Sequence, residues 1–268
     1  MRVALVQLAY GDDESAEARL RRVAGLVEGL GGHDLVVLPE LWAPTGFDYS
    51  LWAERAEPLD GPFSSAMAEL AGSVGVTLHA GSFVERLEAP GPDGNDLANT
   101  SLVFSATGER LAVYRKVHRF GFGSGEPRLM EAGTEVVVVD LPAGDGSSVR
   151  AGVSTCYDLR FPELYRRQQE AGAEMFVVPA AWPAARVGHW RLLGRARAVE
   201  NQCVVVQCNT AGTHAGHEMG GHSQVVAATG EVLAEASGDT EEVLSVDVDP
   251  AATAEYRRAF PVLADRRL

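Results

Sequence analysis

The stretch Ser154-Thr155-Cys156-Tyr157-Asp158-Leu159-Arg160-Phe161-Pro162-Glu163 joins a predicted strand to a predicted helix. The apolar run 149–153 precedes it, and a helical pattern follows over 162–169. Cys156 therefore lies where a strand ends and a helix begins, and open α/β sheets place their chemistry at this edge. A helix N-terminus also favours the thiolate, so we expect a thiol more acidic than a free cysteine, whose pKa is about 8.5. The alternative is a buried core cysteine, the usual position of a lone Cys.

Strands and helices alternate along the whole chain, which predicts the α/β class. The expected strands are 2–8, 35–39, 76–84, 98–105, 110–115, 135–141, 149–153, 175–179, 203–208, 223–228, 232–236 and 243–248, and the expected helices are 16–30, 62–74, 162–169, 186–201 and a C-terminal one from about 249. Segments 35–40 and 175–180 both contain an apolar run that reaches a proline, which suggests a weak internal two-fold relation between two sheets. No linker-like change of composition interrupts the chain, so we expect residues 1–268 to form one domain.

Composition limits the partners of the chain. Its 268 residues are 46% hydrophobic and 22% charged, values typical of a globular protein. A net charge of −14 would repel a phosphate backbone, so nucleic acid is not an expected partner. Three cysteines, Cys156, Cys203 and Cys208, do not make a disulfide framework, which favours a reducing compartment. With no signal-like start and no apolar run near the ~20 residues that span a bilayer, we expect a cytoplasmic protein without membrane contact.

A carboxylate and an ammonium follow two other predicted strands. Glu40 comes directly after the strand 35–39, where it can serve as a general base, and the alternative is a capping or salt-bridging glutamate. Lys116 follows the strand 110–115 and is the only lysine among 23 basic residues. Arginine is the expected surface cation in this composition, so the lysine suggests a role for a compact charge with movable donors. The alternative is that one lysine survived by chance.

Cys156, Glu40 and Lys116 together make a complete set for nucleophilic catalysis. A thiol nucleophile needs a base, which the carboxylate supplies. The tetrahedral intermediate carries an oxyanion, which an ammonium and a backbone N–H can stabilise. This scheme requires no metal, no cofactor and no histidine. A generic Cys–His hydrolase is the alternative, with His118 and His79 as candidate bases.

Two other segments invite functional interpretations that we do not favour. The glycine-rich loop 120–127 lacks the G-x-x-x-x-G-K-[ST] pattern, and no helix is expected to begin in it, so a nucleotide site is not predicted. The segment 213–222 carries the histidines and glutamate of a conceivable metal site, namely His214, His217, His222 and Glu218. Because it is glycine-rich and lacks the H-E-x-x-H spacing, we predict a polar loop. Cys203 and Cys208 lie five residues apart in an apolar strand and are expected to be core residues on opposite faces.

Motifs along the length of the chain resemble those of the nitrilase superfamily of carbon–nitrogen hydrolases. Segments 38–41 (Leu-Pro-Glu-Leu), 114–118 (Tyr-Arg-Lys-Val-His) and 156–163 (Cys-Tyr-Asp-Leu-Arg-Phe-Pro-Glu) resemble the glutamate, lysine and cysteine motifs of that family. Segments 181–183, 189–190, 196–202 and 209–212 are also similar to it. The resemblance implies a four-layer α-β-β-α sandwich that dimerises across helices, among them the helix after Cys156.

The resemblance also implies a role for each reactive group. Glu40 would take the thiol proton and later protonate the departing ammonia. Cys156 would attack the amide carbon and form a thioester, which water, deprotonated by Glu40, would then release as the acid. Lys116 and the backbone N–H of Tyr157 would stabilise the oxyanion.

Family members carry a second glutamate that positions the substrate or the lysine. Its position here is Glu126, with Glu131 as the alternative, although the glycine-rich loop departs from the commoner His-Leu-Phe-Asp start. Trp182 and Pro183, at the end of the next strand, are expected to line the substrate pocket together with Tyr157.

Other polar and aromatic residues near these motifs have structural or binding roles. We expect Arg160 and Glu163 to fix the turn after the nucleophile through charge-assisted bonds, and the alternative is that they contact the substrate. Trp42, Phe47 and Tyr49 form either a second pocket wall or part of the core.

The cysteine motif is most similar to the Nit-like, omega-amidase-like branch, whose members hydrolyse ω-amides of 2-oxo acids or deaminated glutathione. We therefore expect a thiol-dependent amidase that converts a small primary amide to a carboxylate and ammonia without a cofactor. An N-carbamoyl amino acid amidohydrolase is the alternative within the family. A non-catalytic scaffold is the alternative outside it, and the intact Glu, Lys and Cys set argues against a scaffold. The expected assembly is a homodimer or a higher homo-oligomer.

Overall fold

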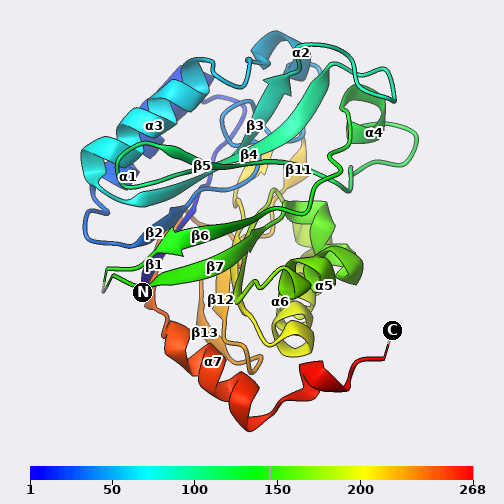
Figure 1. The fold of residues 1–268 in the computed structure, drawn as a ribbon. Helices are drawn as coiled ribbons and strands as arrows, with labels where there is room; N and C mark the ends of the chain where they lie inside the picture. Colours follow the sequence, from blue (N-terminus) through cyan, green and yellow to red (C-terminus); the bar gives the residue numbers. More distant parts are fainter. Residues whose placement is uncertain (145, 268) are drawn as a thin grey trace.

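The computed structural model describes residues 1–144 and 146–267, which form two six-stranded sheets with helices on their outer faces (Figure 1). The first sheet contains β1 (Arg2–Gln7), β2 (Leu35–Val37), β3 (Thr77–Arg86), β4 (Leu97–Phe104), β5 (Arg110–Arg115) and β14 (Glu242–Asp247). The second contains β6 (Val138–Pro142), β7 (Ser148–Val153), β8 (Met175–Pro179), β9 (Val204–Cys208), β12 (Gln224–Val226) and β13 (Val232–Glu235). A small ribbon of β10 (Thr213–His214) and β11 (His217–Glu218) stands apart.

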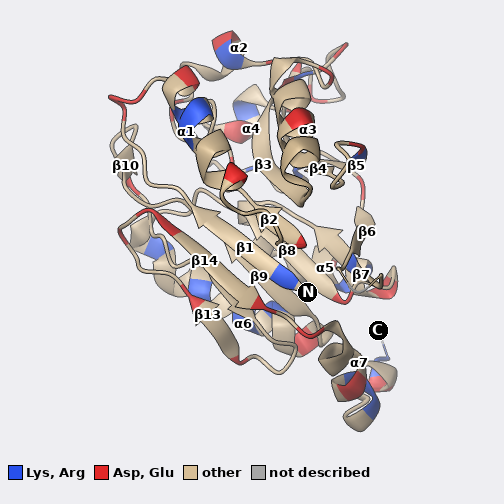
Figure 2. Ribbon diagram, turned by 90° about the vertical axis from the view of Figure 1, so that its left-hand side faces the viewer, with Lys and Arg blue, Asp and Glu red and all other residues tan. Residues whose placement is uncertain are grey.

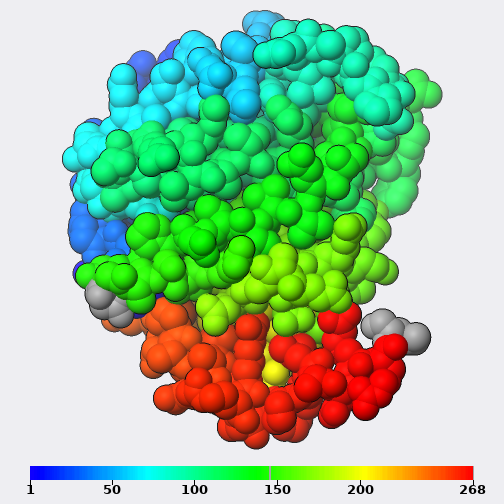
Figure 3. All heavy atoms as spheres, in the orientation of Figure 1, coloured from blue at the N-terminus to red at the C-terminus, as the bar shows by residue number. Residues whose placement is uncertain are grey.

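The helices cover the two sheets from outside. They are α1 (Ala16–Glu28), α2 (Trp52–Arg55), α3 (Pro62–Val74), α4 (Glu126–Leu129), α5 (Pro162–Glu170), α6 (Val187–Asn201) and α7 (Pro250–Ala259). Helices α1 and α3 lie on the first sheet, and α5 and α6 lie on the second (Figure 1). Helix α7 forms one end of the molecule (Figure 3), where the guanidinium of Arg257 donates to the carbonyls of Gln202 and Ala173 at 3.0 and 2.9 Å. Among the described helices, none is long and apolar enough to cross a membrane.

Alternating side chains of β1 and β2 build two separate cores. Val3, Leu5, Leu35 and Val37 pack toward the second sheet. Their neighbours Ala4, Val6, Val36 and Leu38 pack with apolar residues of α1 and α3. Burial on both faces explains why these strands read as continuous apolar runs. The arrangement is a four-layer α-β-β-α sandwich, which confirms the predicted fold class.

The two sheets repeat the same order of strand directions. From β14 to β5 the neighbouring pairs are antiparallel, parallel, parallel, antiparallel and antiparallel, and the same order holds from β6 to β13. In this correspondence β2 matches β8, the two strands whose apolar runs reach a proline. The ends of these two strands meet, because the Glu40 N–H donates to the carbonyl of Ala180 at 3.3 Å. The suggested internal two-fold relation is therefore present in the topology.

Most predicted elements are confirmed to within a few residues at their ends. The prediction that no helix begins in the loop 120–127 is wrong, because the single turn α4 starts at Glu126. Pro127 favours the first turn of a helix, and Gly125 precedes it with a φ of 70° that few other residues adopt. The net negative charge has no single location on the face in Figure 2, where acidic residues lie on several helices, strands and loops.

An irregularity in β3 supports the chain on both sides of Glu40. Gly81 lies there with a φ of 69°, and a Cβ at this position would stand 1.9 Å from the carbonyl oxygen of Pro39. The adjacent Ser82 donates its N–H to the same carbonyl at 3.4 Å, and its hydroxyl accepts from the N–H of Leu41 at 3.1 Å. The glycine therefore allows the close backbone approach that holds Glu40 in place.

We predict that Gly81→Ala lowers the free energy of unfolding by about 2–4 kcal/mol, because left-handed strain adds to a backbone overlap. Chemical denaturation measures this loss. Gly32→Ala is the matched control, since Gly32 has a φ of 85° but open space around it, and we expect it to cost about 1 kcal/mol. Equal losses in the two variants would contradict the importance of the close approach.

Candidate active site

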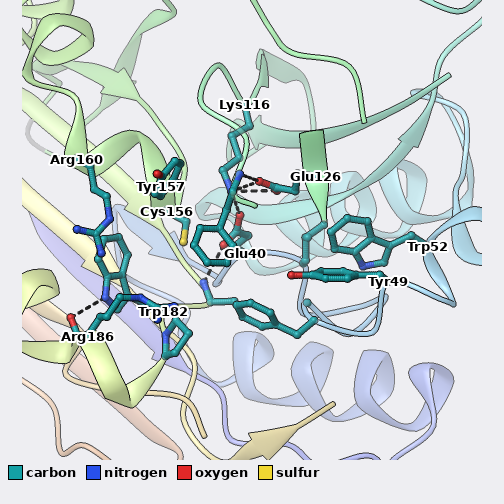
Figure 4. A pocket seen from close by; sticks show the side chains of 16 residues that line it. Glu40, Tyr49, Trp52, Lys116, Glu126, Cys156, Tyr157, Arg160, Trp182 and Arg186 are labelled. Carbon is teal, nitrogen blue, oxygen red and sulfur yellow. Dashed lines mark hydrogen bonds and ion pairs between the residues drawn. The ribbon is translucent and has the colours of Figure 1, made fainter. Parts of the chain in front are cut away.

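A cleft opens where the carboxyl ends of strands from both sheets meet (Figure 4). Its wall is largely aromatic and contains Phe47, Tyr49, Trp52, Phe120, Tyr157 and Trp182. Four buried groups with reactive or ionisable side chains reach the cleft, namely Glu40, Lys116, Glu126 and Cys156. These residues are up to 116 positions apart in sequence, from position 40 to position 156, and the sandwich brings them together.

The turn after β7 presents the sulfur of Cys156 to the cleft. Cys156 has a φ of 47°, in a backbone region that residues other than glycine rarely adopt. It begins a short 3₁₀ turn over Cys156–Arg160. Asp158 holds this turn, because its carboxylate accepts the N–H of Thr155 at 2.9 Å and the hydroxyl of Tyr114 at 2.6 Å. The Thr155 side chain in turn accepts the Asp158 N–H, which completes a capping box. The strained conformation is thus fixed by hydrogen bonds on either side of the nucleophile.

The thiol of Cys156 is neutral in the resting site. Burial raises the pKa of Cys156 well above its usual range, the Glu40 carboxylate raises it further, and Lys116 opposes this only in part. The expectation of a more acidic thiol is therefore wrong. The sulfur is buried beside carboxylates, and a single 3₁₀ turn rather than a long helix begins at this residue. A neutral thiol must lose its proton to a base when it attacks, and the carboxylate of Glu40 lines the same cleft.

Lys116 is buried between two carboxylates. Its Nζ lies 2.7 Å from Glu40 Oε1, and 3.0 and 2.9 Å from the Oε1 and Oε2 atoms of Glu126. Burial alone lowers the pKa of Lys116, but the charges of Glu126 and Glu40 outweigh it, so the pKa lies well above the usual range. The backbone of Lys116 is fixed as well, since its N–H donates to the carbonyl of Asn99 at 2.9 Å. The site therefore holds a permanent positive charge beside the sulfur.

The two glutamates are held by backbone donors as well as by the lysine. Oε2 of Glu40 accepts the N–H of Ala181 at 2.9 Å, and Oε2 of Glu126 accepts the N–H of Phe120. Burial raises the pKa of Glu126, and Lys116 opposes this shift. The alternative second glutamate lies elsewhere: Glu131 accepts backbone N–H groups of the 91–95 turn. Of the two candidates, the geometry brings only Glu126 to the lysine.

Asn99 is a site residue that the sequence interpretation missed. Its side-chain nitrogen donates to both Glu40 and Glu126, at 2.8 and 2.7 Å. The signal in the sequence was an amide in a buried strand, after Leu97 and Ala98 and before Thr100. Buried amides require partners, so this position called for a polar neighbour that the sequence could not identify.

The predicted pocket residues Tyr157, Trp182 and Pro183 all line the cleft. Phe47 and Tyr49 line it too, whereas Trp42 is a core residue whose indole N–H donates to the carbonyl of Ala80 at 3.0 Å. The aromatic loop thus divides between the two alternatives that the sequence left open.

Two arginines form a positively charged part of the cleft. The guanidinium of Arg160 lies 4.6 Å from the ring centre of Trp182, and that of Arg186 lies 5.5 Å from the ring centre of Phe120. Within the described part of the chain, neither guanidinium forms an ion pair with a carboxylate. The prediction that Arg160 and Glu163 fix the turn is wrong, since Asp158 does so and Glu163 is exposed. Arg186 was missed, because nothing in its local sequence distinguishes it from surface arginines.

The histidines do not supply a base for Cys156. His118 donates its backbone N–H to Asp158, its Nδ1 contacts the same carboxylate at 2.8 Å, and its ring stacks on Phe161. His79 is buried in β3, and burial lowers its pKa to about 4. Since neither ring lines the cleft, the Cys–His alternative is wrong.

The histidines of segment 213–222 have separate surroundings. His214 stacks on Tyr10, His217 packs on Phe47, and Nδ1 of His222 lies 2.6 Å from Glu235. In the residues that the structure describes, no group of three or more His, Cys, Asp or Glu side chains could hold a metal ion. Cys203 and Cys208 are both buried in or beside β9, as expected of core residues.

Comparison with known proteins agrees with this geometry. The carbon–nitrogen hydrolase family model matches residues 2–258. The chain belongs to the carbon–nitrogen hydrolase family. Among curated members, it is 45% identical over 265 residues to a 2-oxoglutaramate amidase of Paenarthrobacter nicotinovorans, covering 99% of this chain and 89% of that protein. It is 36% identical over 234 residues to a 2-oxoglutaramate amidase of Bacillus subtilis, covering 87% and 85%.

A solved member of this hydrolase family has the same fold. Nit3 of Saccharomyces cerevisiae, a member of branch 10 of the nitrilase superfamily, superimposes with a TM-score of 0.85 at 31% identity, covering 100% of this chain and 97% of that one. The family expected from the sequence motifs is thereby confirmed.

We predict that Lys116→Met lowers the free energy of unfolding at pH 7 by about 3–5 kcal/mol, because two buried carboxylates lose their counter-charge. The loss should shrink toward about pH 5, where the variant can take up a proton on these carboxylates more readily than wild type. Denaturant unfolding at several pH values measures both effects. Arg110→Met is the control, since its ion pair with Asp60 is exposed and contributes about 0–1 kcal/mol. A Lys116→Met loss that does not vary with pH would contradict the charge argument.

Proposed function

We propose that this hydrolase cleaves the terminal amide of a small 2-oxo acid, an ω-amide such as 2-oxoglutaramate, to a carboxylate and ammonia. The observation that carries this proposal is one cleft with a reactive sulfur, a carboxylate–ammonium pair and two arginines that have no acidic partner among the described residues. Two curated relatives are named for 2-oxoglutaramate amidase activity, which supports the same substrate class. The reaction is an acyl transfer to sulfur followed by hydrolysis.

In the proposed reaction, Glu40 removes the thiol proton as Cys156 Sγ bonds to the amide carbon. The oxyanion that forms is stabilised by Lys116 and by the backbone N–H of Tyr157. Glu40 then gives its proton to the nitrogen, the carbon–nitrogen bond breaks, and ammonia leaves a thioester. A water molecule deprotonated by Glu40 attacks the thioester carbon and restores the thiol. Glu126 keeps Lys116 in position throughout.

The two arginines would bind the carboxylate end of the substrate. Figure 4 shows Cys156 between Arg160 and Lys116, so an amide at the sulfur leaves the other end of a short substrate toward the arginines. Two guanidinium groups close enough to interact lower each other's affinity for protons, and the pKa of Arg160 is lowered first by burial and also by Arg186. A bound carboxylate would relieve this unfavourable arrangement through charge-assisted hydrogen bonds.

We also propose that residues 1–268 form one catalytic domain that assembles as a homodimer in the cytoplasm. Helix α6 exposes Leu192 and Val199, at 65% and 49% of their surface, and Leu233 on β13 is 40% exposed. These exposed apolar side chains favour a second copy as their partner, and the mass in solution tests the assembly. Three unpaired cysteines, one of them the nucleophile, favour a reducing compartment.

Wild type should release ammonia from a 2-oxo acid ω-amide at least tenfold faster, in kcat/KM, than from an uncharged amide of equal length, because charge-assisted bonds discriminate by about 1.5–3 kcal/mol. Cys156→Ala is expected to abolish turnover, and Lys116→Arg to lower kcat on the order of 10²-fold or more, as for loss of an oxyanion donor. Coupled ammonia detection measures both. N-carbamoyl substrates would also release carbon dioxide, so preference for them would contradict the ω-amide assignment, and undiminished turnover in Cys156→Ala would contradict the mechanism.

Removing one cation of the cleft should weaken substrate binding selectively. For Arg186→Ala we expect KM for the 2-oxo acid ω-amide to rise about 10–100-fold, with little change for an uncharged amide. Steady-state kinetics on the two substrates separates these effects. Arg128→Ala serves as the control, because Arg128 is exposed on α4 outside the cleft and its loss changes the net charge equally. A similar KM change for both substrates would count against carboxylate binding at Arg186.

A further inference from the structure

Asn99 joins the two glutamates of the site through one nitrogen. Its Nδ2 donates to Oε1 of Glu40 and to Oε1 of Glu126, and these are the oxygens that also accept from Nζ of Lys116 at 2.7 and 3.0 Å. Two nitrogens and two oxygens therefore form a closed ring of alternating donors and acceptors. Asn99 is 2% exposed and does not line the cleft, so it acts on the chemistry only through this ring.

The number of hydrogens in the ring has a consequence for catalysis. An amide nitrogen has two N–H bonds, and Asn99 uses both on carboxylates. An ammonium has three N–H bonds. Lys116 donates hydrogen bonds to one oxygen of each carboxylate, and its 2.9 Å contact with Oε2 of Glu126 is an ion-pair contact only. One lysine N–H remains for the oxyanion that forms at the substrate carbon. Without the amide, the carboxylates would have unmet acceptor capacity and would compete for that remaining N–H.

The ring also balances an excess of negative charge. Two carboxylates face a single ammonium in a buried site, so the group carries a net charge of −1 when both are ionised. Hydrogen bonds to an ionised carboxylate favour the ionised form. The bond from Asn99 opposes the effect of burial, which raises the pKa of Glu126. The amide thus supplies part of the positive field that a second cation would otherwise have to provide.

The backbone of the same residue sets the position of the lysine. The carbonyl of Asn99 accepts the N–H of Lys116 at 2.9 Å across the β4–β5 pair. A side-chain substitution leaves this backbone bond available, so variants at position 99 test the amide group itself.

We propose that Asn99 is a positioning residue that holds the carboxylates of Glu40 and Glu126 in alignment through its two N–H bonds, so that Glu40 can accept the thiol proton while one N–H of Lys116 stays free for the oxyanion. This role rests on the proposed function, and it assigns to the amide a part of the catalytic geometry that the Glu, Lys and Cys set does not provide.

The test compares Asn99→Leu, which has a similar size and no donor, with Thr100→Val on the same strand. Thr100 is also fully buried and donates to a carboxylate, but to that of Glu85, outside the cleft. For Asn99→Leu we expect kcat to fall on the order of 10²-fold with KM within about twofold of wild type, since the loss is of hydrogen bonds to charged groups away from the substrate. The acid limb of kcat against pH should move to higher pH by about one unit, because the carboxylates then take up protons more readily.

Thr100→Val is expected to lose stability without moving the acid limb. Asn99→Ser keeps a single hydroxyl donor, so its kcat and the position of its acid limb should lie between those of wild type and Asn99→Leu. If Asn99→Leu does not fold, Asn99→Ser tests the proposal in its place. An unshifted acid limb in the folded Asn99 variants would overturn the proposal, because a merely structural asparagine would lower the amount of active protein and leave its pH dependence unchanged.

A second measurement needs no substrate. The rate at which iodoacetamide alkylates Cys156, followed by mass spectrometry across pH, reports the proton transfer from the thiol to Glu40. Asn99→Leu should shift its acid limb in the same direction as in turnover. If wild type releases no ammonia from ω-amides yet this shift occurs, the proposed substrate fails while the role of Asn99 holds. An unchanged alkylation profile in an enzyme that does hydrolyse ω-amides would overturn the role of Asn99 alone.

Discussion

The buried ion pair of Lys116 with Glu40 and Glu126 is the interaction on which the site depends. Removing three charges from water is costly, and their attraction offsets this only where the geometry is good and the remaining donors and acceptors are satisfied. Here the backbone N–H groups of Ala181 and Phe120 complete the carboxylates. These donors come from different parts of the chain, so the buried charges are fully hydrogen-bonded only after both sheets have assembled. The ion pair is thus stabilised by the fold and in turn requires it.

A neutral thiol suits this arrangement better than a preformed thiolate. A thiolate at Cys156 would add a further negative charge to a buried group that already contains two carboxylates and one ammonium. In the proposed reaction, the proton moves to Glu40 as the sulfur attacks, so the total charge of the site does not change. The new negative charge then forms on the substrate oxygen, beside Lys116. The raised pKa of the thiol and the nearby carboxylate are therefore two parts of one proton-transfer design.

The sequence predicted those features that depend on local pattern and failed where distant groups decide. Burial on both faces makes β2 and β8 continuous apolar runs, so the sequence shows where each of these strands ends. Motif resemblance located Glu40, Lys116 and Cys156. The acidity of the thiol was misjudged, because its pKa is raised by burial and also by a carboxylate 116 positions away in the chain. Arg160 was assigned to the turn because it follows Cys156 closely in sequence. Asp158 forms the hydrogen bonds of that turn instead, and Arg160 lines the cleft. The sequence around Asn99 shows only an amide in a buried strand, and its partners are defined only once the fold brings two glutamates to it.

The internal repeat explains why the site lies where it does. Each half of the molecule contributes a sheet with three parallel central strands, and the matching strands β2 and β8 end side by side. Glu40 follows the first of these strands, and Cys156 follows β7, the neighbour of the second. Neither sheet alone carries both a nucleophile and its base. Packing the sheets face to face therefore buries the main core and assembles the catalytic pair in the same step, so that the stability of the core and the geometry of the site are set by one contact between the two halves.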